Sequence, residues 1–331
     1  MLDLQRLRKI KLATRPVGQV VVANTMLLID YHVPRRTEIV FEGVENIPRD
    51  RSVIFAMNHT DRHNYWPFQY KMCRLGLPFT ATWVKGKNYE NPVAAWVLDH
   101  CNNIPLPSRG FVIATEFRKH TDRAPTEQEY RLMRDLVDRR RDWDAGLPDD
   151  AGPHVPAFIA AFGGAQGADG FLEAFDALFE AMIRESLRLS RRALQELGNN
   201  LLVFPQGTRS IRLLRGRTGM MQAAWHLGHA IVPVGCNGSD KLYPGLSPFS
   251  KGGRVVYRIG KPLELDGPEL SPHRVPADVL PFMREATQQY GEVYQAGIDV
   301  VMNHIDALLD PKYRFAGDTS EDAAKGINRF V

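Results

Sequence analysis

The sequence VIFAMNHTDRHN at residues 53–64 decides the fold, together with LLVFPQGTRS at residues 201–210. Each segment opens with a short apolar run, 53–57 and 201–204, which is typical of a strand buried on both faces of a parallel sheet. Polar and reactive side chains follow each run directly. Because ligand sites in open α/β sheets lie just outside the carboxyl ends of the strands, both segments are candidates for such a site.

Other apolar runs predict the remaining strands, and helical patterns lie between several of them. The expected strands are 53–57, 79–84, 103–106, 201–204, 231–234 and 255–259, and the expected helices are 65–75, 92–100, 185–197, 219–227 and 281–309. Strands that alternate with helices imply a sheet covered on both faces. The predicted fold class is therefore α/β, with a mostly parallel sheet flanked by helices.

Residues 110–181 break this alternation, because no clear strand pattern occurs there. We expect a highly charged helix at 130–143, a loop at 146–153 and another helix at 171–183. The region is interpreted as a helical insertion into an α/β domain that spans residues 37–310. An N-terminal amphipathic helical segment, 1–36, and a C-terminal tail, 311–331, complete the expected organisation.

The side chains of the two segments suit proton transfer and anion binding. His59 is the natural general base, since imidazole exchanges protons near neutral pH. In the second segment Gly207 lets the backbone approach a ligand, Thr208 offers a hydroxyl, and Arg209 can hold a phosphate through two hydrogen bonds. Arg62 and His63 are expected at the surface or at the edge of the substrate site.

The two segments resemble the signature motifs of the glycerolipid acyltransferase family, the lysophosphatidate acyltransferase (PlsC-like) group. That family has Asn-His-x-x-x-x-Asp and Phe-Pro-Glu-Gly-Thr-Arg-Ser, whereas this chain has amides, Asn64 and Gln206, in place of both acids. The resemblance covers residues 38–263 apart from the insertion. It implies transfer of a fatty acyl group from an acyl-CoA or acyl-carrier-protein thioester to the hydroxyl of a lysophospholipid or glycerol phosphate, without a cofactor or a metal.

The resemblance also implies roles for single residues. Asn64 stands where the family has an aspartate that orients the histidine, and an amide oxygen can still accept the ring N–H without supplying a charge. Gln206 would bind the acceptor together with the glycine, threonine and arginine that follow it. Arg109 resembles a phosphate-contacting arginine of the family. Asp61, the acid nearest to His59, is an alternative partner for its ring.

Composition limits the partners. The formal net charge of +4 favours an anionic partner such as a phospholipid surface or coenzyme A, but it is not the dense basic patch of a nucleic-acid-binding protein. The three cysteines are odd in number and widely spaced, which suits neither a disulfide framework nor a zinc site and indicates a reducing compartment.

The N-terminal segment predicts contact with a membrane surface. The longest apolar stretch, 17–29, is interrupted by polar residues and is too short to span a bilayer. Residues 4–12 interleave apolar and basic side chains, a pattern that can lie among lipid headgroups. Four side chains are expected to share one helical face: Val20, Val21, Leu27 and Leu28. We therefore expect a cytoplasmic protein, peripheral or monotopic at a membrane, with packing of this segment on its own domain as the alternative.

Two hypotheses of function follow. The first is an O-acyltransferase in which His59 deprotonates the acceptor hydroxyl. The second is a catalytically weak or inactive protein of the same fold that binds lipid or acyl-CoA, because both motif acids are replaced. A hydrolase is disfavoured, since the Gly-x-Ser-x-Gly sequence of a nucleophile elbow does not occur.

Overall fold

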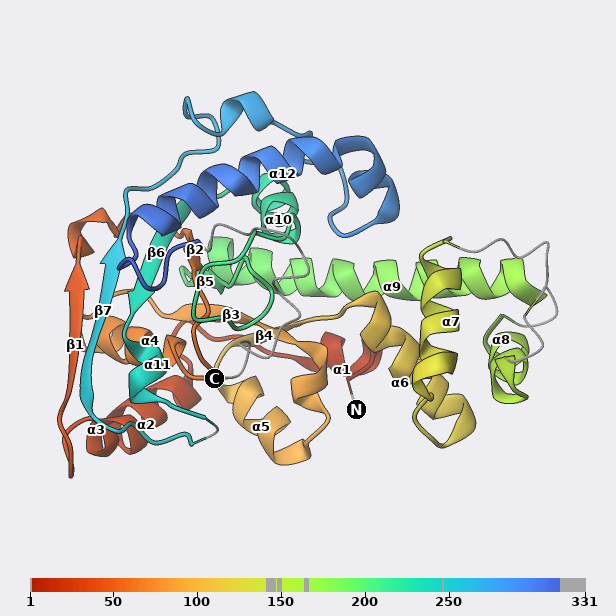
Figure 1. Ribbon diagram of the computed structural model, residues 1–331, viewed down its shortest axis with the longest axis horizontal. Coiled ribbons are helices and arrows are strands. Elements are labelled where there is room, and N and C mark those ends of the chain that lie inside the picture. Colours follow the sequence, from red (N-terminus) through yellow and green to blue (C-terminus); the bar gives the residue numbers. More distant parts are fainter. Residues whose placement is uncertain (1, 141–146, 148–150, 164–166, 246, 316–331) are drawn as a thin grey trace. The chain divides into compact units, whose positions relative to one another are not determined.

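The computed structural model describes residues 2–140, 147, 151–163, 167–245 and 247–315 (Figure 1). The chain divides into two compact units. Unit 1 comprises Met1–Lys11, Val84–Asp99 and Ile104–Arg188, and unit 2 comprises Leu12–Trp83, His100–Asn103 and Leu189–Val331. These units differ from the expected domains, because the N-terminal segment is shared between them and unit 1 extends beyond the expected insertion.

A seven-stranded sheet forms the framework. Its strands are β1 (Thr37–Glu42), β2 (Ile54–Met57), β3 (Thr80–Lys85), β4 (Asn103–Leu106), β5 (Asn200–Val203), β6 (Ile231–Asn237) and β7 (Gly253–Ile259), in the order β1-β7-β6-β2-β5-β3-β4. β2 pairs in parallel with both β5 and β6, as do β3 with β5 and β1 with β7, whereas β6 and β7 are antiparallel. The expectation of a mostly parallel α/β sheet is confirmed.

Helices of unit 2 cover both faces of this sheet. They are α2 (Val17–Asn24), α3 (Met26–Asp30), α4 (Tyr65–Arg74), α10 (Gly219–Leu227), α11 (Ser239–Leu242) and α12 (Arg284–Ala307), with short 3-10 turns at Val44–Asn46 and Ser271–His273 and a π-helical stretch at Arg192–Glu196. Phe55 and Met57 of β2 pack with Phe68 of α4. Ile54 and Ala56 alternate with them and point to the opposite face, since successive side chains of a strand point to opposite faces. They are buried too, so both faces of β2 are covered. α10 and α12 lie on that opposite face (Figure 1).

The order of the strands places the two signature segments side by side. β2 leads through α4 to β3 on one side, and β5 leads through α10 to β6 on the other. Right-handed crossovers in opposite directions require helices on opposite faces, as observed. Because β2 and β5 are parallel neighbours, their carboxyl ends and the segments that follow them meet at one edge of the sheet.

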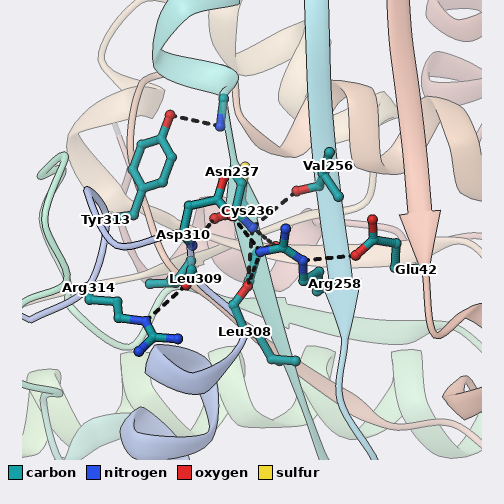
Figure 2. A network of polar contacts seen from close by, with 12 residues as sticks. Glu42, Cys236, Asn237, Val256, Arg258, Leu308, Leu309, Asp310, Tyr313 and Arg314 are labelled. Atoms are coloured by element: carbon teal, nitrogen blue, oxygen red, sulfur yellow. Dashed lines mark hydrogen bonds and ion pairs between the residues drawn. The ribbon is translucent and has the colours of Figure 1, made fainter.

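Hydrogen bonds and ion pairs connect residues 308–310, which follow α12, to the antiparallel strands β6 and β7 (Figure 2). Arg258 of β7 donates to the carbonyl of Leu308 over 3.1 Å and forms an ion pair of 2.8 Å with Asp310. Asn237 of β6 accepts the N–H of Asp310 over 2.7 Å and donates to Leu308 over 3.2 Å. Arg258 also pairs with Glu42 of β1, so the network links this edge of the sheet to the C-terminal part of unit 2.

Unit 1 is mainly helical. It contains α1 (Leu4–Lys9), a 3-10 turn at Gly86–Tyr89, α6 (Arg109–Thr121), α7 (Glu127–Val137), α8 (His154–Gly163), and most of α5 (Pro92–His100) and α9 (Gly167–Arg191). Rings of α6, α8 and α9 pack edge to face or tilted, among them Phe117 with Phe158 and Phe158 with Phe171. The described part of 110–181 contains helices and no strand, as expected.

Some predicted boundaries are wrong. The separate helices expected at 171–183 and 185–197 form one helix, α9, that ends in the π-helical stretch, because no breaking residue lies between them. The charged helix begins earlier than expected, at Glu127, because Thr126 and Glu129 form a capping box, and it ends at Val137. Strand β1 was not predicted, and residues 141–146 and 316–331 lie outside the described part of the chain.

The N-terminal segment also differs from the expectation. Leu7 and Ile10 are buried, so the apolar side chains of the basic stretch pack within the protein rather than on a lipid surface. The single face expected at 20–28 is not formed, because the helix is interrupted at Thr25, where φ is −119° and ψ is −86°. Leu27 is therefore buried, whereas Val21 is 51% exposed. No helix among the described residues is long and apolar enough to cross a bilayer.

Candidate functional site

The first residue after β2 is held as if the strand continued. The side chain of Asn58 accepts a hydrogen bond from the N–H of Cys236 over 2.7 Å and donates one to its carbonyl over 3.0 Å. An asparagine amide thus replaces the main-chain pairing with β6 at the point where β2 stops. This fixes the position of the next residue, His59.

The main chain of His59 is bound by the second segment on both sides. Its N–H donates to Oε1 of Gln206 over 2.9 Å, and its carbonyl accepts the N–H of Ser210 over 2.8 Å. The ring of Phe204 stacks on the imidazole, with centroids 4.1 Å apart and planes 22° apart. The structure therefore brings the two signature segments into direct contact around His59.

The imidazole of His59 pairs with Asn64, and its tautomer can be deduced. Nδ1 lies 2.9 Å from Oδ1 of Asn64, whose Nδ2 donates to the carbonyl of Asn58 over 2.8 Å. Because that carbonyl can only accept, the amide must present its oxygen to the ring. Nδ1 of His59 therefore carries the proton and Nε2 carries the lone pair. The hydroxyl of Tyr257 donates to the carbonyl of Asn64 over 2.5 Å and anchors the residue from β7.

Gln206 is oriented by the same logic. Its Oε1 must face His59, since the main-chain N–H there can only donate. Its Nε2 is buried, in a residue that is 2% exposed, and it has no hydrogen-bond partner among the described residues. Buried polar atoms are nearly always paired, so this amide N–H₂ group is a candidate contact for a ligand oxygen.

The segment after Gln206 turns sharply. The N–H of Gly207 donates to the carbonyl of Phe204 over 3.0 Å, and the φ of Gly207 is +67°, in the left-handed region that favours glycine. Thr208 and Arg209 follow, both half-buried. Burial lowers the pKa of Arg209, and the neighbouring charge of Arg62 lowers it further. The two guanidinium groups thus concentrate positive charge beside the turn.

Asp61, the alternative partner of the histidine, is engaged within its own loop. Its carboxylate accepts the hydroxyl of Thr60 over 2.9 Å and the N–H of His63 over 2.8 Å. The residue is 8% exposed, and this burial raises its pKa. The geometry pairs the ring of His59 with Asn64, while Asp61 shapes the loop between them.

His63 was expected at the surface or at a substrate edge, but it is buried, with 7% of its surface exposed. Its ring lies against Trp66 and Tyr243, with centroid separations of 4.3 Å and 5.3 Å. The pKa of His63 falls to about 4, first because of burial and then because of the charges of Arg62 and Arg209. The surface alternative is wrong because of this aromatic packing, which the sequence of the loop does not reveal, whereas a place at the edge of the substrate site stays a prediction.

Arg109 belongs to unit 1, as the first residue of α6. There it forms an ion pair of 3.7 Å with Asp138, and its guanidinium lies over the ring of Phe179 at 5.4 Å from the centroid. A role for Arg109 in binding an acceptor phosphate stays a prediction.

Sequence reasoning missed several residues that hold the site. Phe204 belongs to the strand run and to the second motif but was given no role, although it stacks on His59, and Tyr257 was assigned only to a strand. A signal existed for Asn58, which directly precedes the histidine in the first motif. No signal marked Tyr257, since its contact with Asn64 joins residues 193 positions apart.

Other features of the described residues lie away from this site. No group of three or more His, Cys, Asp or Glu side chains among them is arranged to hold a metal ion. A cavity of about 830 Å³ opens in unit 2, lined by residues that precede β2, β5 and β6, including Ser52, Gly198 and Ala230. It lies at the amino ends of these strands, whereas the signature segments follow their carboxyl ends.

Comparison with known proteins finds a likeness among solved structures. No protein-family model and no curated protein matches the chain. The crystal structure of the 1-acyl-sn-glycerophosphate (LPA) acyltransferase PlsC from Thermotoga maritima resembles this structure with a TM-score of 0.43 and 17% sequence identity. The match covers 85% of this chain and 78% of that chain.

Proposed function

We propose that the protein is an O-acyltransferase that moves a fatty acyl group from an acyl-CoA or acyl-carrier-protein thioester to a hydroxyl of a lysophospholipid or glycerol phosphate. The observation that carries this proposal is the meeting of two distant motifs around one imidazole. Gln206 and Ser210 hold the main chain of His59, while Asn64 sets its tautomer. Both motifs resemble those of glycerolipid acyltransferases.

In this mechanism Nε2 of His59 accepts the proton of the acceptor hydroxyl while the hydroxyl oxygen attacks the thioester carbonyl. A new carbon–oxygen bond forms, and the tetrahedral intermediate collapses by breaking the carbon–sulfur bond. The imidazolium then returns its proton to the departing thiolate. No covalent acyl-enzyme is required.

The amide at position 64 weakens this base less than a comparison with serine proteases suggests. There, replacing the triad aspartate by asparagine lowers kcat about 10⁴-fold, because the asparagine holds the wrong tautomer. Here the carbonyl of Asn58 fixes Nδ2 of Asn64, so the oxygen faces the ring and the productive tautomer is kept. Only the stabilisation of the imidazolium by a full negative charge is missing.

The acceptor is proposed to carry a phosphate, bound by the second segment. Nε2 of Gln206 supplies donors, Gly207 permits close approach of the backbone, and Thr208 offers a hydroxyl. Arg209 adds positive charge beside Arg62. The family resemblance implies that Arg109 also contacts this phosphate.

The same function favours contact with a membrane surface, where a lysophospholipid acceptor and the acylated product reside. Four exposed apolar side chains lie on α2 and α3: Val17, Val21, Leu28 and Ile29. Exposed Arg15, Arg35 and Arg36 flank these helices in sequence. Apolar side chains bordered by basic ones suit the interface of an anionic bilayer. We name these four side chains the α2–α3 apolar patch.

An assay of thiol release tests the proposal. Purified protein is incubated with acyl-CoA and lysophosphatidate, and free coenzyme A is followed beside His59→Ala and beside His32→Ala, whose imidazole is exposed on the surface. We expect acceptor-dependent release that falls about 10²- to 10⁴-fold in His59→Ala and is unchanged in His32→Ala. Tight binding of acyl-CoA without release, across a panel of lysolipids and glycerol phosphate, would instead identify a binding protein.

A further inference from the structure

The ring of His63 is buried without hydrogen bonds. Both Nδ1 and Nε2 are shielded from solvent, and neither has a partner among the described residues. A neutral imidazole has one N–H donor and one acceptor, so both kinds of group are left unsatisfied at once. Native proteins rarely tolerate this, and the exceptions call for a specific reason, such as a contact made by a ligand.

The surroundings of His63 give no structural reason for an imidazole. Its ring packs against Trp66 and Tyr243, a contact that phenylalanine would make equally well. Its backbone N–H, rather than its ring, anchors the loop to Asp61. The identity of the side chain is therefore not explained by the folding of the loop.

The charges beside His63 indicate what kind of ligand would supply the missing hydrogen bonds of its ring. Arg62 is exposed and Arg209 is half-buried, and both act electrostatically on the ring. Asp61, the nearby acid, is occupied by Thr60 and by the N–H of His63. Two cations next to an unsatisfied donor favour an anion with several acceptor oxygens, such as a phosphate monoester.

A low pKa fits this arrangement. With a pKa of about 4 the ring is uncharged near neutral pH, so it adds no buried positive charge to those of Arg62 and Arg209 nearby. A neutral imidazole still has an N–H to donate. Arg62 and Arg209 then supply the charge, and the imidazole supplies a directed hydrogen bond.

We propose that His63 is a phosphate-binding residue, whose ring N–H donates to an oxygen of the acceptor's phosphate while the nearby Arg62 and Arg209 balance the phosphate's charge. The inference rests on the proposed function, because that function identifies the phosphate as part of the acyl acceptor. It assigns a specificity role to a residue four positions after the proposed base.

Binding measurements test this inference apart from turnover. Calorimetry compares a short-chain lysophosphatidate with the matching monoacylglycerol, which lacks the phosphate. The variants are His63→Phe, which keeps the aromatic packing, His63→Gln, which keeps an N–H donor, and the surface control His32→Phe. We expect His63→Phe to weaken binding of the phosphate ligand about tenfold or more, as for one hydrogen bond to a charged group.

The remaining expectations separate recognition from packing. Affinity for the monoacylglycerol stays unchanged in His63→Phe, and His63→Gln retains most of the affinity for lysophosphatidate. In the acyl-transfer assay His63→Phe raises KM for the phosphate acceptor while kcat stays near the wild-type value. Its thermal midpoint should not fall, since the substitution removes two unsatisfied buried nitrogens.

Three results would overturn the inference: unchanged affinity of His63→Phe for lysophosphatidate, an equal loss for both ligands, or no binding of the phosphate ligand by the wild type. If His63→Phe does not fold, ring-nitrogen NMR signals of the wild-type protein decide the matter, because glycerol phosphate must shift those of His63. If phosphate binding depends on His63 but no thioester is consumed, the acyltransferase proposal fails and this inference stands.

Discussion

The main-chain N–H of His59 donates a hydrogen bond of 2.9 Å to Oε1 of Gln206. A main-chain donor thus dictates which end of this amide faces inward, as the carbonyl of Asn58 does for Asn64. The two residues that depart from the family motifs are consequently fixed by main-chain groups that do not titrate. At position 206 the effect is to present an N–H₂ group to the ligand, where a glutamate would present an oxygen.

This orientation gives an expectation for Gln206→Glu. One carboxylate oxygen would still accept the N–H of His59, but the other would replace Nε2 and repel an anionic ligand oxygen. We expect KM for a phosphate-bearing acceptor to rise about tenfold, the usual size of a lost charge-assisted hydrogen bond. Initial rates of thiol release over a range of lysophosphatidate concentrations measure it.

Gln222 provides a matched control, because it is also buried and its Oε1 also accepts a main-chain N–H, that of Phe282. Gln222→Glu places the same charge in a buried position on α10, where Nε2 donates to Oγ1 of Thr218 rather than facing a ligand, so it should lower stability without raising KM. A fall of KM in Gln206→Glu would mean that the group facing position 206 is a donor, such as a hydroxyl, and would contradict the assignment.

Asn64→Asp restores the acid of the family motif, yet we expect it to harm this protein. The residue is fully buried, and the new oxygen would lie where Nδ2 is now, 2.8 Å from the carbonyl oxygen of Asn58. Exchanging a hydrogen bond for this repulsion should lower the free energy of unfolding by about 2 kcal/mol or more, measured by urea denaturation. kcat should not increase.

Asn200→Asp is the control for the cost of a buried carboxylate alone. Asn200 is fully buried and its Oδ1 accepts the N–H of Val53, while its Nδ2 has no partner among the described residues. It should therefore lose less stability than Asn64→Asp. A large gain of kcat in Asn64→Asp at unchanged stability would show that the surroundings accept an acid and that the amide restrains the reaction.

The sequence was sufficient for the parts of the site that depend on local pattern. Strands buried on both faces are continuous apolar runs, so β2 and β5 could be located, and their parallel pairing places His59 beside Gln206. β1 escaped prediction because it is an edge strand with only partial burial, and its sequence TEIVFE mixes apolar and charged residues.

Features that depend on tertiary packing could not be predicted. The burial of His63 results from Tyr243, which is 180 positions away in the chain and contributes its ring only once the sheet is formed. The prediction that residues 20–28 share one helical face is wrong because Thr25 has non-helical backbone angles and changes the direction of the chain. Periodicity assumes a continuous helix, and it fails where the helix is broken.

Unit 1 contains an ion pair whose pH dependence has a definite sign. Glu129 accepts hydrogen bonds from Arg123 and from the N–H of Thr126, and the nearby guanidinium is the main reason that its pKa falls to about 2 from its ordinary value of 4.5. The unfolded chain therefore binds a proton at a higher pH than the folded chain. This contribution to stability is complete above pH 4.5 and is lost as the pH falls toward 2.

We expect Glu129→Gln to make the free energy of unfolding less dependent on pH in this window, since its side chain cannot titrate. Urea denaturation at a series of acidic pH values measures the slope. Glu127→Gln is the control, because Glu127 pairs with Arg131 on the exposed surface of the same helix and its side chain is 76% exposed. Equal slopes for wild type and Glu129→Gln would refute the assignment.

The α2–α3 apolar patch leads to an expectation about membrane binding. Val21 and Ile29 are 51% and 63% exposed, so polar residues there should not disturb the core. The double variant Val21→Gln/Ile29→Gln removes apolar area that would enter the bilayer interface, and we expect it to reduce partitioning onto phosphatidylglycerol-containing vesicles about tenfold in a sedimentation assay. Leu75→Gln, at the end of α4 and 40% exposed, controls for the loss of any surface apolar side chain.

The choice of acceptor distinguishes a loss of membrane binding from a loss of catalysis in this double variant. Turnover of a soluble short-chain lysophosphatidate should be the same in the double variant and in the wild type, because His59 and Gln206 lie in segments that the substitutions do not touch. Turnover of a long-chain acceptor in vesicles should fall in parallel with partitioning. If the double variant sediments with vesicles as completely as the wild type, another surface must contact the lipid.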